Sequence, residues 1–293
     1  MSTVPPPYGP PPPPPPEEPP GYQPFDSYYR PQQVPQQPQR RTGRNGLLGG
    51  LVAALLTILA YGKYAILLIP KLGAFGTLIT MLVSFGAYAI FFGPWFAAGL
   101  VLMILVHEMG HVVEIRRQGM AATAPLFIPF LGAAVFMRQN SRNALQQAQV
   151  AIAGPLAGTA GATAAFVLYG QTHWLPLLVW AHLGFFINLF NLIPLGMLDG
   201  GWIMAVVSKW FQLIGLAALL LSLLFLPVSP IILLVILLGL PVLFARFRGD
   251  DAEYYRSVPP QARLAMGGAW LFLVAFLAFA TFQSQELLTR LVG

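Results

Sequence analysis

The sequence predicts an all-α polytopic membrane protein with about 6–8 transmembrane helices and a re-entrant loop or small hairpin. The first reason is composition: 56% of the 293 residues are hydrophobic and 9% are charged, against roughly 25% charged in soluble domains. The second is that charge is absent from Leu72 to Val106 and from Trp210 to Ala245, runs long enough to cross a bilayer. The third is an apolar stretch between 113 and 148 that proline and glycine interrupt too often for a spanning helix.

Residues 1–45 are rich in proline, glutamine and tyrosine and include an unbroken proline run from Pro10 to Pro16. Such a segment buries too little apolar surface to offset the entropy of ordering, so we expect a disordered proline-rich tail with polyproline II character. The composition favours a plain solvated tail, and recruitment of a partner that binds proline motifs is the alternative.

Hydrophobic segments follow this tail along the rest of the chain. They lie at about 46–69, 72–92, 95–113, 148–169, 174–193, 211–226, 229–245 and 264–282. Most approach the ~20 residues that a spanning helix needs, although the segments in 211–245 are short. We therefore expect an N-terminal membrane segment at 46–71, a membrane core at 72–210 and C-terminal transmembrane helices at 211–293.

Arginine placement predicts which side of the membrane each loop faces. One face collects eight arginines if 148–169 and 174–193 form a helical hairpin and 211–245 forms another: Arg116, Arg117, Arg138, Arg142, Arg246, Arg248, Arg256 and Arg263. The Gly170–His173 loop carries neither lysine nor arginine. We expect a multi-pass protein of the plasma membrane with the arginine-rich face towards the cytoplasm. The side of the tail and the number of spans before His107 stay open.

The motif HEMGH at 107–111 places three ionisable residues at the end of an apolar segment. His107 and His111 are four residues apart, so on a helix they share a face and can bind one metal ion. Glu108 can reach the metal-bound water, where a carboxylate acts as general base. A charge at the centre of a membrane helix costs at least ~2.5 kcal/mol, so these residues need a compensating role. A structural metal site is the alternative, but it leaves Glu108 without a task.

A catalytic zinc ion normally takes three protein ligands and leaves a fourth position for water, so a third ligand is needed. The polar candidates in or beside apolar segments are Asp199, His182, Glu114, Asn188 and Asn191. Glu114 adjoins two arginines, which favours a surface ion pair. Asp199 lies in a run broken by proline and glycine, where the chain can unwind and aim a carboxylate sideways. An ordinary helix N-cap explains Asp199 equally well.

HEMGH and the later sequence NLIPLGMLDG, Asn191–Gly200, together resemble the site-2 protease family of intramembrane metalloproteases, whose paired motifs are HExxH and NxxPxxxLDG. The resemblance covers about residues 72–210 and marks this core as a metalloprotease. It implies one zinc ion per chain held by His107, His111 and Asp199. It also implies that Glu108 activates water to cleave peptide bonds within or near transmembrane segments of membrane proteins. We expect this catalytic face to point towards the cytoplasm.

The sequence AGPLAG, Ala153–Gly158, resembles the Gly-Pro segment that this family has between its two motifs. The candidate substrate-binding residues are Gly154 and Pro155 of this segment together with Asn191, for which a hydrogen bond between helices is an equal alternative. Family members often have asparagine at the position of Gly158 and arginine at that of Trp202, and these departures bear on substrate positioning rather than zinc binding. We expect Asn188 to serve packing and His182 to make a hydrogen bond between helices.

The expected partners are a membrane-protein substrate and the lipid bilayer, and no nucleic acid. Residues 124–137 could offer an edge strand to an unwound substrate, or serve only as a plug. The competing functions are a catalytically silent membrane scaffold and an ion-coupled transporter. The intact HEMGH argues against a scaffold, and no internal repeats are seen that would favour a transporter. The chain contains no cysteine, which excludes a Cys-based metal site.

Overall fold

The computed structural model describes residues 73–225, 230–248 and 252–292, together with residues 9, 13, 14 and 17. The structure is mostly helical in these ranges and contains one small two-stranded hairpin, as the sequence predicts. Apart from those four positions, the predicted tail at 1–45 and the predicted membrane segment at 46–71 lie outside the described residues.

The elements follow one another as helices with a single hairpin between the second and third. In chain order they are α2 (Ala74–Phe92), α3 (Pro94–Arg117), β1 (Leu126–Ile128), β2 (Gly132–Ala134), α4 (Ala144–Thr172), α5 (Leu175–Asn191), α6 (Asp199–Val207), α7 (Trp210–Phe225), α8 (Pro230–Arg248), α9 (Ala252–Arg256) and α10 (Pro260–Val292). Among the described residues, α2, α3, α4 and α10 are long and apolar enough to cross a membrane, and α5 and α7 are shorter apolar helices. The presence of helices long and apolar enough to span a membrane is confirmed, and the total of about 6–8 spans stays a prediction.

Several helices are longer than the hydrophobic segments that predicted them. The segment 264–282 belongs to a helix that runs over Pro260–Val292, and the segment 95–113 belongs to one that ends at Arg117. Hydropathy marks only the apolar part of a helix, whereas the backbone hydrogen bonds continue into polar turns. In α3 the final turn carries Arg116 and Arg117, whose positive charges suit the negative end of the helix dipole.

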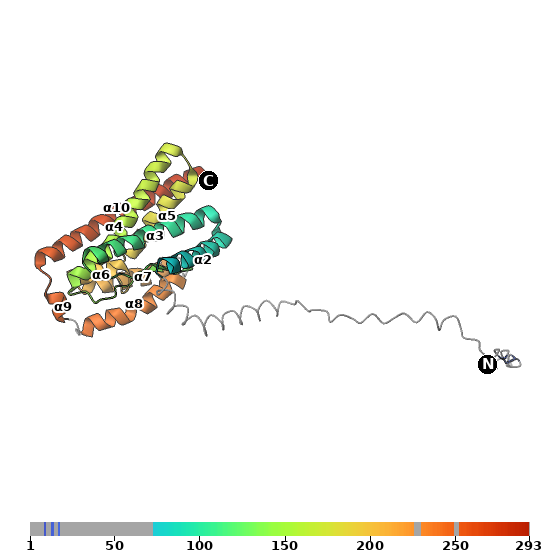
Figure 1. Cartoon of the computed structure of the whole chain (residues 1–293), viewed down its shortest axis with the longest axis horizontal. Coiled ribbons are helices and arrows are strands. Elements are labelled where there is room, and N and C mark those ends of the chain that lie inside the picture. Colours follow the sequence, from blue (N-terminus) through green and yellow to red (C-terminus); the bar gives the residue numbers. More distant parts are fainter. Residues whose placement is uncertain are drawn as a thin grey trace, which may run out of the picture. The chain divides into compact units, whose positions relative to one another are not determined.

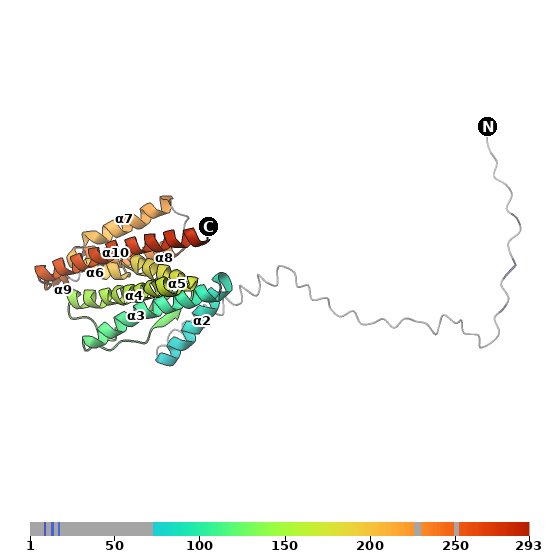
Figure 2. The ribbon, with the colours of Figure 1, turned by 90° about the horizontal axis from the view of Figure 1, so that it is seen from above.

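Helices α3, α4 and α5 pack against one another, and α6 and α10 pack against this group. Figures 1 and 2 show α3, α4 and α5 side by side, with α6 at the end of the group where α3 finishes. One apolar core joins all five helices and includes Met103, Ile152, Phe185, Ile203 and Leu277. The chemistry-bearing helix α3 is therefore held on two sides by other helices.

Large apolar side chains also cover the outside of the helices, for example Leu82 and Ile90 on α2 and Phe272 and Phe279 on α10. A soluble protein rarely exposes contiguous apolar surface on this scale, whereas lipid tails solvate it without penalty. The exposed faces of α2 and α10 thus fit contact with a lipid bilayer.

The hairpin β1–β2 is antiparallel, with Leu126 opposite Ala134 and Ile128 opposite Gly132. Of the two alternatives predicted for residues 124–137, a re-entrant loop or a small hairpin, the hairpin is confirmed.

Helix α2 holds one side of this hairpin through three polar side chains. Thr77 donates its hydroxyl to the carbonyl of Pro125 at 2.7 Å, and the Phe127 amide donates to the Thr80 hydroxyl at 3.3 Å. At the turn, the amide of Phe130 donates to the Tyr88 hydroxyl at 2.9 Å. The outer edge of β1 is consequently occupied by α2, and β2 lies on the side of α3.

Candidate metal centre

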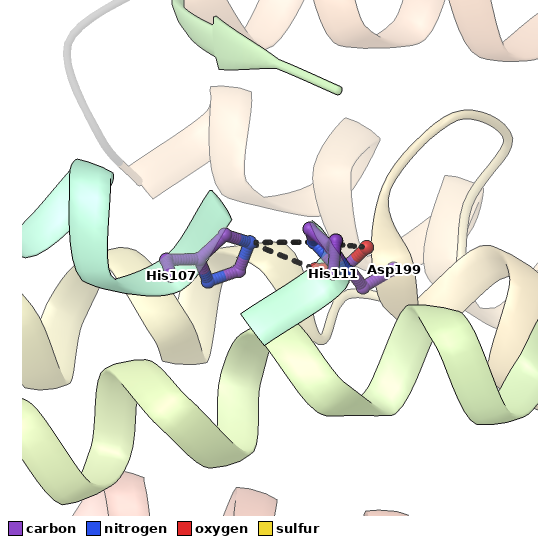
Figure 3. A group of neighbouring side chains, drawn as sticks. All are labelled: His107, His111 and Asp199. Carbon is purple, nitrogen blue, oxygen red and sulfur yellow. Dashed lines mark hydrogen bonds and ion pairs between the residues drawn. The ribbon is translucent and has the colours of Figure 1, made fainter. Parts of the chain in front are cut away.

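Two imidazoles one helical turn apart form the first half of the site. His107 and His111 project from the same face of α3, and their Nε2 atoms lie 3.2 Å apart (Figure 3). His107 is buried, with 4% of its surface exposed. The four-residue spacing in the sequence thus produces the predicted convergence of the two rings.

Asp199 completes the group from a different element. It is the first residue of α6, after a break that includes Pro194 and Gly196, whose φ of 53° suits glycine. Its carboxylate oxygens lie 3.1 Å from Nε2 of His107 and 3.4 Å from Nε2 of His111. The three ligand atoms all lie within 4.8 Å of one another, close enough to hold one metal ion.

The hydrogen bonds behind the rings determine which nitrogen carries the proton. Nδ1 of His111 lies 2.9 Å from the carbonyl oxygen of Val150, and Nδ1 of His107 lies 2.8 Å from Oδ1 of Asn188. The Asn188 amide is fixed the right way round because its Nδ2 donates to the carbonyl of Gly184 at 2.7 Å. Both partners of the rings are therefore acceptors. Each Nδ1 must donate, and in the neutral imidazole each Nε2 is then left with a lone pair.

Three lone-pair donors consequently face a common point. They are the two Nε2 atoms and the Asp199 carboxylate, whose Oδ2 is buried and accepts no hydrogen bond. Such an arrangement is repulsive unless a cation lies between the donors. Two imidazole nitrogens and one carboxylate oxygen are a ligand set that zinc takes in hydrolytic enzymes, with a fourth position left for water. The residues present thus fit the zinc ion that the sequence predicts.

The backbone of α4 packs directly against the two histidine rings. A Cβ atom at Gly154 would overlap the imidazole of His111 and lie 3.0 Å from Nε2 of His107. A Cβ atom at Gly110 would likewise overlap the carbonyl of Ala153, so glycine is needed on both helices. The AGPLAG segment is thus a close support for the ligands. The predicted substrate contacts of Gly154 and Pro155 stay a prediction.

Glu108 lies beside the ligands without belonging to their group. Only 7% of its surface is exposed, and its carboxylate faces the backbone of Val135, the residue after β2. The carboxylate is thus placed between the histidine pair and the hairpin. Its predicted role as general base stays a prediction.

The other candidates for the third ligand lie outside the group formed by the described residues. His182 makes the predicted contact between helices, with Nδ1 lying 3.0 Å from Oγ of Ser284 in α10. Glu114 makes the predicted ion pair with Arg117 at 2.7 Å, with the arginine exposed and the carboxylate buried. Asn191 donates to the carbonyl of Ile187 one turn earlier, at 3.1 Å, and its predicted substrate contact stays a prediction.

The expectation that Asn188 serves packing is wrong in one respect, because its amide hydrogen-bonds a candidate metal ligand. Sequence reasoning missed this contact because it joins residues 81 positions apart on different helices. Gly158 is part of the same arrangement, since a Cβ atom there would overlap the Asn188 amide. The departure from the family pattern at Gly158 therefore makes room for a side chain from α5.

Two arginines secure the far end of the helix that begins with Asp199. Arg263 in α10 donates to the carbonyl of Val206 at 2.7 Å and to that of Tyr255 at 2.5 Å. Arg246 in α8 approaches the carbonyl of Ala205 at 3.4 Å. The last carbonyls of a helix have no partner within it, so these cations both satisfy them and suit the helix dipole.

Residues 95–175 match the family model described as peptidase family M50. This range contains His107, Glu108, His111 and the AGPLAG segment and ends before Asp199. None of the curated proteins matches the chain.

Proposed function

We infer that this chain, which contains a peptidase family M50 domain, is an intramembrane metalloprotease of the site-2 protease family. On this premise, it hydrolyses peptide bonds within or near transmembrane segments of membrane proteins. The observation that supports this most is the convergence of His107, His111 and Asp199, with the buried Glu108 beside them. The proposal includes one zinc ion per chain as the cofactor.

Each residue has a task in the proposed reaction. His107, His111 and Asp199 hold the zinc ion, which supplies Lewis-acid activation of water and of the scissile carbonyl when bound. Glu108 accepts a proton from the attacking water while the oxygen of that water forms a bond to the carbonyl carbon. The same carboxyl group then gives this proton to the amide nitrogen, and the C–N bond breaks. The products are a carboxylic acid and an amine.

The hairpin next to Glu108 supplies a way to present the substrate. The Phe127 amide points away from β2 towards Thr80, so Phe127 and Ala133 are a pair without mutual hydrogen bonds. The amide and carbonyl of Ala133 then point away from β1, along the edge of β2. An unwound substrate segment can pair with that edge as an added strand. Crosslinking of a substrate to cysteine at position 133 checks this pairing, and a hairpin that only plugs the site gives no crosslink.

Metal removal tests the proposed function directly. We expect the purified protein to contain one zinc ion per chain and to cleave a candidate transmembrane substrate reconstituted with it. A zinc chelator should stop the cleavage and added zinc should restore it, because the water and the carbonyl lose their activation without the metal. His107→Ala should lose both zinc and cleavage. Undiminished zinc in His107→Ala protein would contradict the proposed site.

The proposed orientation places the arginine-rich loops in the cytoplasm. Helices α5, α7 and α8 would then cross the membrane together with α2, α3, α4 and α10, which lies within the predicted total of about 6–8 spans. Arg142→Cys should resist an impermeant thiol reagent added to intact cells, and Gln171→Cys, in the exposed last turn of α4 at the opposite end, should react. The chain has no other cysteine, so each label reports one position. Labelling at 142 with protection at 171 would reverse the orientation.

A further inference from the structure

We propose that Asn188 is a positioning residue for the metal centre, fixing the tautomer and the orientation of the His107 ring. The inference rests on the proposed zinc site and is independent of the substrate. Asn188 belongs to α5, and neither HEMGH nor the motif that carries Asp199 includes it.

The geometry leaves little freedom to the Asn188 side chain. It is fully buried, its Nδ2 donates to Gly184 at 2.7 Å, and its Oδ1 lies 2.8 Å from Nδ1 of His107. Turning the amide over would set its NH₂ group against the His107 N–H and its oxygen against the Gly184 carbonyl. Both contacts would then be repulsive, so the amide can hold only one orientation. That orientation forces the Nδ1–H tautomer and directs the Nε2 lone pair of His107 to the metal.

The space for this amide comes from α4. A Cβ atom at Gly158 would overlap both Oδ1 and Nδ2 of Asn188, so any larger residue there displaces the amide. His111 is oriented differently, by the backbone carbonyl of Val150, which substitution of a side chain cannot remove. Of the two ring partners, Asn188 is therefore the one whose contribution can be deleted. Gly158 offers a second, separate way to disturb it.

Zinc affinity, measured by competition with a chromophoric chelator, gives the main test. Asn188→Leu keeps a similar volume and removes the acceptor, so the His107 ring can turn or change tautomer. We expect zinc affinity to fall roughly 10–100-fold, the usual effect of losing the hydrogen-bond partner of a ligating histidine. The cobalt-substituted variant should also show an altered visible absorption spectrum, because the ligand geometry changes. A residue that only packs would move neither quantity.

Matched variants separate positioning from general damage. Ser284→Ala removes another hydrogen bond between α5 and a neighbouring helix, the one to His182, and should leave zinc affinity unchanged. Gly158→Ala should weaken zinc binding in the native chain, but should add nothing in an Asn188→Ala background, where there is no amide to displace. This pair of variants also serves if Asn188→Leu does not fold.

Two results would overturn the inference: native zinc affinity in folded Asn188→Leu, or additive effects of Gly158→Ala and Asn188→Ala. Zinc retained by His107→Ala protein would instead remove the metal site itself. The failure of this inference and the failure of the proposed function therefore give different results.

Discussion

Replacement of Glu108 by glutamine should abolish cleavage while the protein keeps its zinc. Glutamine preserves the shape of the side chain, but its amide cannot accept the proton of the attacking water. General acid–base catalysis by a positioned side chain contributes about 10²–10⁴-fold, so we expect a rate loss at the upper end of that range. The measurement is cleavage of a reconstituted transmembrane substrate together with zinc content by metal analysis.

The control is the zinc content of the Glu108→Gln protein itself. Glu108 lies outside the group of converging ligand atoms, so the metal should remain at the native level. Loss of zinc together with activity would make Glu108 part of the binding site rather than the base. Cleavage at the native rate would remove the proposed proton transfer altogether.

Asp199→Ala should lose both zinc and cleavage. The carboxylate is the only anionic member of the ligand group formed by the described residues, and it reaches both imidazoles from the start of α6. Its removal leaves two neutral nitrogens, which make a weak zinc site. We expect zinc affinity to fall by more than the roughly 10–100-fold that loss of a ligand's hydrogen-bond partner causes. Chelator competition gives this value on the same scale as for Asn188→Leu.

An N-cap role for Asp199 predicts a different result. Its loss would then lower the free energy of unfolding by about 0.5–2 kcal/mol and leave the zinc in place. The structure speaks against that role, because Asp199 is already the first helical residue and the start of α6 has no side-chain cap. Full zinc occupancy in Asp199→Ala would nevertheless remove this residue from the metal site.

The parts of the site that follow from local spacing could be predicted from the sequence. His107 and His111 converge because four residues make about one helical turn, a property of any helix. Asp199 was a different case, because its local sequence suits a ligand and an N-cap equally. The resemblance to a known family decided between them, and the structure then placed the carboxylate beside the histidines.

The supports of the site could not be predicted, because they join residues far apart in the chain. The backbone carbonyl of Val150 accepts the hydrogen bond from His111. Every residue has such a carbonyl, so the sequence does not show which one contacts the ring. The need for glycine at position 154 follows from how closely α3 and α4 approach, which depends on packing between helices. Hydropathy predicted the spans for a simple reason, since lipid solvates apolar side chains wherever they occur. It underestimated the lengths of α3, α4 and α10 because helix ends are decided by hydrogen bonding and capping.

The hydrogen bond from Arg263 to the end of α6 has a consequence for the order in which the site is assembled during synthesis. The histidine pair is synthesised early, but the helix that carries Asp199 gains its C-terminal partners only after α8 and then the start of α10 have emerged. A nascent chain that stops before Arg263 lacks one of the contacts that hold the C-terminal end of this helix. We therefore expect metal binding to be completed late in biogenesis, and a chain truncated before α10 to hold zinc more weakly than the full chain.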